Sequence, residues 1–144
     1  MSVPGEGGDV TDVLFDTAML TGTNTGVAIK ALPSFVGTAS NITWRNIRMD
    51  SVAEAVMVNM YNQNANMYNQ NANIGTARAA NLVIDSVSGT AKSAGKLLCS
   101  PGAGACTDVV MSNVHLQAGS GYTCQDVHGT ASQCQPQPCL NNDY

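Results

Sequence analysis

The 144-residue chain has six basic and ten acidic residues, which give it a formal net charge of −4 and a pI near 4.7. This balance argues against nucleic acid as a partner, because phosphate backbones are bound by basic clusters. No apolar run approaches the length needed to cross a membrane. The charged fraction is only 11% and small polar residues are abundant, a composition typical of solenoids built from stacked strands.

The chain begins with a glycine-rich segment, residues 1–9, in which residues 1–5 show neither the basic start nor the apolar run of a secretory leader. A patterned segment follows at residues 10–20. Counted from Asp12, apolar residues fall at +1, +3, +6 and +8, and Thr17 stands at +5. A period of two within each pair predicts a strand, and the slip between the pairs predicts a bend at Thr17.

This repeat unit occurs three more times, starting at Asn41, Asn81 and Asp108. Each copy again has a small polar residue at +5. A single unit can bury its apolar side chains only against another unit, which is how stacked solenoids are stabilised. We therefore predict an all-β fold, a right-handed parallel β-helix, with a ladder of small polar side chains at its bends.

A second short strand follows each of the first three copies, at residues 27–30, 54–59 and 95–99. Between the second and third copies, residues 59–65 are duplicated as residues 66–72. These asparagine-rich heptads cannot form a coiled-coil seam, so we predict an extended surface loop. We predict β-helix coils over residues 1–132 and a Pro/Cys/Asn-rich cap or tail over residues 133–144.

The five cysteines lie in the last third of the chain, at positions 99, 106, 124, 134 and 139. They contain no C-x-x-C pair and the chain has only two histidines, so we predict no metal site and no cofactor. Two local disulfides with one thiol left over are expected, which indicates an oxidising compartment. Asn41-Ile42-Thr43 is a glycosylation sequon at the start of a strand. Trp44 alternates with Ile42 and is therefore expected in the core.

Several segments together resemble one enzyme family. They are, in order, residues 26–30 (GVAIK), 41–47 (NITWRNI), 98–106 and 124–139. Their order and spacing are similar to the C-terminal part of glycoside hydrolase family 28, the polygalacturonases that degrade pectin. The resemblance implies a right-handed parallel β-helix, in agreement with the repeat. It also implies a secreted, extracellular protein whose partner is galacturonan.

The family hydrolyses α-1,4-linked galacturonan with inversion, using one carboxylic acid to protonate the leaving oxygen and others to activate water. Its carboxylates come from Asn-Thr-Asp and Asp-Asp motifs, which are followed by a His-Gly motif. This chain has no Asn-Thr-Asp, no Asp-Asp and no His-Gly in that place, and residues 1–3 resemble the segment just after the family's His-Gly. We therefore assign no catalytic residue and expect this chain alone to be an inactive C-terminal part. Glu54 is the best remaining acid, yet a catalytic role is not expected for it.

The substrate-binding motif of the family, Arg-Ile-Lys, is matched in part. Ile29 and Lys30 match it, whereas Ala28 stands where the arginine is expected. An alanine cannot replace the bidentate fork that arginine offers to a carboxylate. The resemblance thus implies that Lys30 and Tyr61 contact the sugar. It also implies two disulfides, Cys99 with Cys106 and Cys124 with Cys139.

Two alternatives remain open from the sequence. The chain could be a non-catalytic carbohydrate-binding β-helix, which sugar binding dependent on Lys30 would support. It could also be a structural solenoid that associates with itself through an exposed strand edge. Within the family, action on rhamnogalacturonan is open as well.

Overall fold

The computed structural model describes residues 2–3, 8–31, 36–60, 77–102 and 105–141. Its strands are β1 (Ser2–Val3), β2 (Val10–Thr21), β3 (Thr25–Lys30), β4 (Gly37–Asn59), β5 (Ala77–Leu98), β6 (Cys106–Gln125) and β7 (Val127–Ser132). The described residues form no α-helix, and no helix among them is long and apolar enough to cross a membrane.

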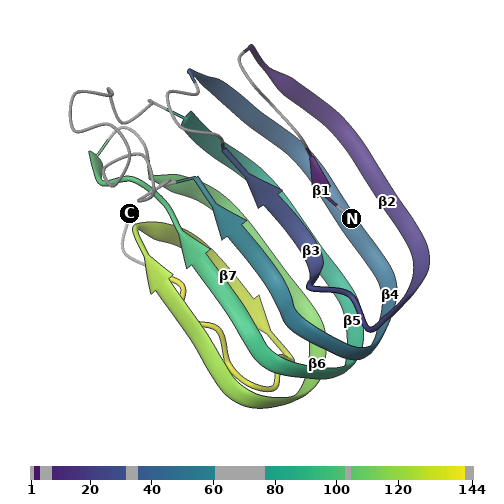
Figure 1. The fold of residues 1–144 in the computed structure, drawn as a ribbon. Helices are drawn as coiled ribbons and strands as arrows, with labels where there is room; N and C mark the ends of the chain where they lie inside the picture. Colours follow the sequence, from purple (N-terminus) through teal and green to yellow (C-terminus); the bar gives the residue numbers. More distant parts are fainter. Residues whose placement is uncertain (1, 4–7, 32–35, 61–76, 103–104, 142–144) are drawn as a thin grey trace, which may run out of the picture.

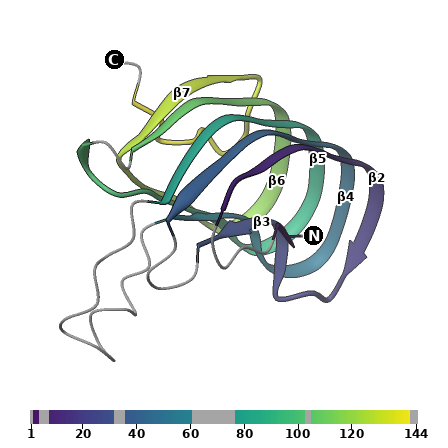
Figure 2. The ribbon, with the colours of Figure 1, turned by 90° about the horizontal axis from the view of Figure 1, so that it is seen from above.

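All strand pairs are parallel, and together they form one sheet that wraps around a core (Figure 1). The order is β1-β3-β4-β5-β6-β7, with β2 also paired to β4. Figure 2 shows the long ribbons of β4, β5 and β6 curving around in parallel, each making most of one coil. The fold is a partial parallel β-helix, which confirms the predicted fold class.

The four repeat units stack in register, as the sequence predicts. Their +1 residues form one row across the coils, in which Val13 pairs with Ile42, Ile42 with Leu82, and Leu82 with Val109. One difference from the prediction concerns continuity. In β4, β5 and β6 the repeat unit runs into the second strand without a break, whereas β2 and β3 are separate and joined by a turn at residues 22–24.

The bends lie where the sequence places them. The residues at +5 have φ between 52° and 62°, in the left-handed region: Thr17, Asn46, Ser86 and Asn113. The residues at position zero are left-handed too: Asp12, Asn41, Asn81 and Asp108. Short polar side chains tolerate this conformation better than apolar ones, because they can hydrogen-bond locally. The bend positions therefore require the small polar residues that the repeat unit carries.

The core consists of the inward positions of the stacked coils. Trp44 is fully buried, as predicted, and its ring stacks on that of Phe15 with centroids 5.8 Å apart and planes 12° apart. In the first unit Val13, Phe15, Ala18 and Leu20 are only partly buried. This follows because β2 pairs with β4 alone among the described strands.

A close approach of two backbones explains the glycine at +8 of the third unit. Gly89 has φ +135°, and a Cβ built there would lie 1.9 Å from the carbonyl oxygen of Met49. The register between β4 and β5 shifts directly after this contact, between Met49 and Val52. Glycine is the residue that permits both the conformation and the contact.

The C-terminal segment returns to the last coils and is held there covalently. The Leu116 N–H donates to the Gln135 carbonyl at 2.7 Å, and the Asn141 N–H donates to the Val127 carbonyl at 2.9 Å. Disulfides join Cys99 to Cys106 and Cys124 to Cys139, as the family resemblance implies. The remaining cysteine, Cys134, is a buried thiol.

Outside the core, the bends carry a polar ladder. The Arg45 guanidinium lies 2.7 Å from the Asp16 carboxylate, and the Asn46 amide donates to the same carboxylate at 3.1 Å. These contacts, the Arg45 hydrogen bond above all, hold the pKa of Asp16 well below its usual range. Two coils further on, the Ser112 hydroxyl donates to Asp85 at 2.7 Å and lowers the pKa of that carboxyl as well.

The Asp85 contact predicts an acid-sensitive contribution to stability. A carboxyl whose pKa is lower in the folded chain than in the unfolded chain stabilises the fold at any pH above its ordinary pKa near 3.9. This contribution is lost as the pH falls through the lowered pKa. Asp85→Asn should therefore lower the free energy of unfolding at pH 7 by about 1 kcal/mol, because the charged hydrogen bond is partly exposed to solvent. Urea unfolding should show this difference shrinking as the pH falls below the ordinary pKa near 3.9. A difference that stays constant as the pH falls further would show that ionisation of Asp85 is irrelevant.

Candidate functional site

The second strands of the coils form one continuous face, made of residues 25–30, 54–59, 93–98 and 120–125. We call this the second-strand face. Along β3, Val27 and Ile29 are buried in the core, so the period of two points Ala28 and Lys30 to the opposite face, where Ala28 is also buried and Lys30 is exposed. One outward row runs from Lys30 in β3 to its neighbours in β4, β5 and β6, which are Asn59, Leu98 and Gln125.

Lys30 is exposed at the last position of β3. Its amine makes no ion pair within the described part of the chain. The neighbouring Asn59 has a side-chain oxygen that is buried and has no hydrogen-bond partner among the described residues. An ammonium group can donate three hydrogen bonds, so Lys30 can accept a carboxylate ligand at this edge.

A second cation on this face was not singled out from the sequence. Lys96 stands in the outward row that begins at Ala28 and continues through Met57. Its amine lies 4.0 Å from a carboxylate oxygen of Glu54. Lys96 is two coils away from Ala28, or about 10 Å at the usual strand spacing. It therefore cannot take the place of the missing arginine beside Lys30. Its outward position in a period-two strand was the signal that could have identified it.

The second-strand face contains one carboxylate, Glu54. Inverting hydrolysis of a glycoside requires two carboxyl groups about 6.5–9.5 Å apart. The described part of this face therefore cannot supply the pair. Tyr61, the second residue for which the resemblance implies sugar contact, lies outside the described residues, as does most of the duplicated segment 59–72.

The sequon residue Asn41 is exposed at the left-handed start of the second repeat unit. Its side-chain nitrogen lies 3.3 Å from a carboxylate oxygen of Asp12 in the neighbouring coil. Attachment of a sugar to this nitrogen would have to preserve or replace that hydrogen bond. Glycosylation at Asn41 stays a prediction.

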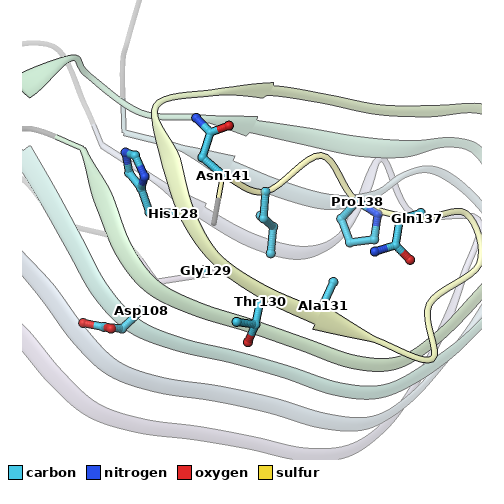
Figure 3. A pocket seen from close by; sticks show the side chains of 9 residues that line it. Asp108, His128, Gly129, Thr130, Ala131, Gln137, Pro138 and Asn141 are labelled. Carbon is cyan, nitrogen blue, oxygen red and sulfur yellow. The ribbon is translucent and has the colours of Figure 1, made fainter. Parts of the chain in front are cut away.

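The two histidines lie at different places. His115 is exposed on β6, as its outward position between Val114 and Leu116 predicts. His128 lines a pocket of about 410 Å³ at the C-terminal end, together with Asp108 and Asn141 (Figure 3). Within the described residues, no group of three or more His, Cys, Asp or Glu side chains could hold a metal ion.

Comparison with known proteins gives one family. A family model described as glycosyl hydrolases family 28 matches residues 1–135. The chain is 31% identical over 143 residues to a probable polygalacturonase of Arabidopsis thaliana, covering 94% of this chain and 32% of the relative. It is 29% identical over 125 residues to polygalacturonase-2 of Solanum lycopersicum, covering 83% of this chain and 27% of the relative. No solved structure matches it significantly.

The chain thus spans less than a third of the length of these curated relatives. The family model, in contrast, covers nearly all of this chain. The parallel β-helix is also the fold that the resemblance implies. The chain belongs to glycosyl hydrolase family 28.

Proposed function

We propose that these coils are the C-terminal part of a polygalacturonase-like enzyme that hydrolyses α-1,4-galacturonan with inversion. The named relatives are polygalacturonases, and the family match extends over most of the chain. The contribution of this part is binding of the substrate, because the described second-strand face has one carboxylate and exposed lysines. The two disulfides support secretion, since such bonds persist in oxidising compartments.

The observation that carries the binding proposal is the position of Lys30. It stands in the Arg-Ile-Lys place of the family, and the fold turns its side chain outward at the exposed end of β3. Lys96 lies further along the same face. A galacturonan chain carries one carboxylate on each sugar, so two separated lysines can bind different sugars of one chain.

Replacement of Lys30 should weaken binding of galacturonan without unfolding the protein. A charge-assisted hydrogen bond contributes about 1.5–3 kcal/mol, so we expect Lys30→Met to bind galacturonate oligomers at least about tenfold more weakly. Calorimetric titration measures this effect. Lys92→Met is the matched control, because Lys92 is an exposed lysine of β5 outside the second-strand face. Equal affinity of Lys30→Met and the unmodified chain would exclude Lys30 as a contact.

The catalytic part of the proposal has its own test. The chain as given should release no reducing sugar from polygalacturonate, because its described face lacks the carboxyl pair. Measured release at a rate above that of a heat-denatured sample would contradict the assignment of no catalytic residue.

A further inference from the structure

A second open pocket lies on the bends of the repeat units, away from the second-strand face. It has a volume of about 670 Å³ and is lined by the +5, +6 and +7 positions of the stacked units. We call it the bend pocket. Its lining contains Arg48 and His115 and no acidic residue, in a chain where acidic residues outnumber basic ones. We propose that the bend pocket binds an acidic oligosaccharide, with Arg48 holding a sugar carboxylate.

The geometry of the +7 row supports this assignment. Met19, Arg48, Ser88 and His115 are paired in register across the four coils. All four residues are exposed. The row therefore presents an apolar side chain, a guanidinium, a hydroxyl and an imidazole at the strand spacing of about 4.8 Å. Apolar contact combined with donors and acceptors at regular intervals is the chemistry that suits a sugar chain.

The polar groups of this row are available to a ligand. Within the described part of the chain, the side chains of Arg48, Ser88 and His115 make no hydrogen bond or ion pair. Arg45, in contrast, is paired with Asp16. An unpaired guanidinium offers a planar fork that binds a carboxylate through two parallel hydrogen bonds.

The acidic residues nearest to the pocket do not neutralise the positive charge of Arg48. Asp16 and Asp85 occupy the +4 row, one position outside the lining. Asp16 is engaged by Arg45 at 2.7 Å, and Asp85 accepts hydrogen bonds from Ser112 and Asn113. The same +4 and +5 contacts hold the bends in place, so the pocket wall is built before a ligand arrives. Such preformed sites lose little free energy to ordering on binding.

The proposal rests on the proposed function only for the choice of a uronate chain as the ligand. A trimer of galacturonate is the probe. Titration followed by NMR should shift the amide signals of Ser88 and His115. Arg48→Met should weaken this response at least about tenfold and leave the response of Asn59 unchanged. Arg78→Met, which removes an exposed arginine from the start of β5, is the matched control.

Each outcome separates the two sites. If Ser88 and His115 do not respond, or respond equally in Arg48→Met, the bend pocket is not a uronate site, whatever happens near Lys30. A different outcome is that the Ser88 and His115 signals respond, the Asn59 signal does not, and Lys30→Met binds the trimer as tightly as the unmodified chain. This would support the bend pocket as a uronate site and exclude a binding role for Lys30. A neutral galactose trimer that produces the same shifts with the same affinity would overturn the role of the carboxylate.

Discussion

Replacement of Trp44 by alanine should destabilise the chain by about 3–5 kcal/mol, the range for loss of a large aromatic side chain from a packed core. Trp44 is fully buried and occupies the +3 row between Phe15 and Ile84. Its removal would leave a cavity and remove the ring that Phe15 stacks on. Because a whole domain is stable by only about 5–15 kcal/mol, this loss should lower the midpoint of urea unfolding severely. Circular dichroism measures it.

A conservative replacement separates the packing of the ring from the cost of its polar group. The Nε1 atom of Trp44 is buried and has no hydrogen-bond partner among the described residues. A buried donor without a partner costs about 1–3 kcal/mol. Trp44→Phe removes this donor and retains an aromatic ring, so the free energy of unfolding should decrease by less than about 1.5 kcal/mol. A loss as large as that of Trp44→Ala would show that the indole fits its site in a way that a smaller ring cannot reproduce.

Removal of the disulfide between Cys124 and Cys139 should cost about 3 kcal/mol, the value expected for a closed loop of this length. The effect should be local as well as global. The bond attaches the C-terminal segment to the last coil, where the Asn141 N–H donates to Val127 and the Gly129 N–H donates to Asn141. In Cys124→Ala/Cys139→Ala, hydrogen exchange at these two amides should become at least tenfold faster.

The other disulfide provides the control. Cys99 and Cys106 are separated by seven residues and lie at the join between β5 and β6. Cys99→Ala/Cys106→Ala should lower global stability by about 2 kcal/mol, because the closed loop is shorter. It should leave exchange at Asn141 unchanged after correction for the global loss. Faster exchange at Asn141 in this control than in the Cys124/Cys139 variant would contradict the local role of the C-terminal disulfide.

Burial also changes the pKa of Tyr122, which lies near the disulfide between Cys124 and Cys139. Tyr122 has a buried hydroxyl without a hydrogen-bond partner in the described residues, and burial raises the pKa of its phenol well above the usual range. The phenol is therefore neutral at neutral pH. A neutral phenol is compatible with the apolar contacts that Tyr122 makes at the edge of the core.

The sequence by itself determined the repeat, the rows and the bends. Apolar residues at +1, +3, +6 and +8 predicted which side chains face the core, and the phase slip with a small polar residue at +5 predicted the bends, whose left-handed backbone the structure then showed. Both properties are local, because a strand alternates its side chains and the left-handed conformation is tolerated by few residue types. Trp44 in the core and His115 outside it followed from the same alternation. The pairing of Cys124 with Cys139 and the place of Lys30 came from the family resemblance, not from the pattern.

Contacts between coils were decided only by the tertiary structure. The pairing of Arg45 with Asp16, the approach of Gly89 to Met49 and the row of Arg48, Ser88 and His115 all join residues that lie 27 or more positions apart. Each depends on the register between neighbouring coils. The sequence does not reveal this register, because the loops between the repeat units differ in length. The bend pocket exists because four separate bends are stacked. Its lining, in which Arg48, Ser88 and His115 come from three different repeat units, is therefore a property of the assembled solenoid.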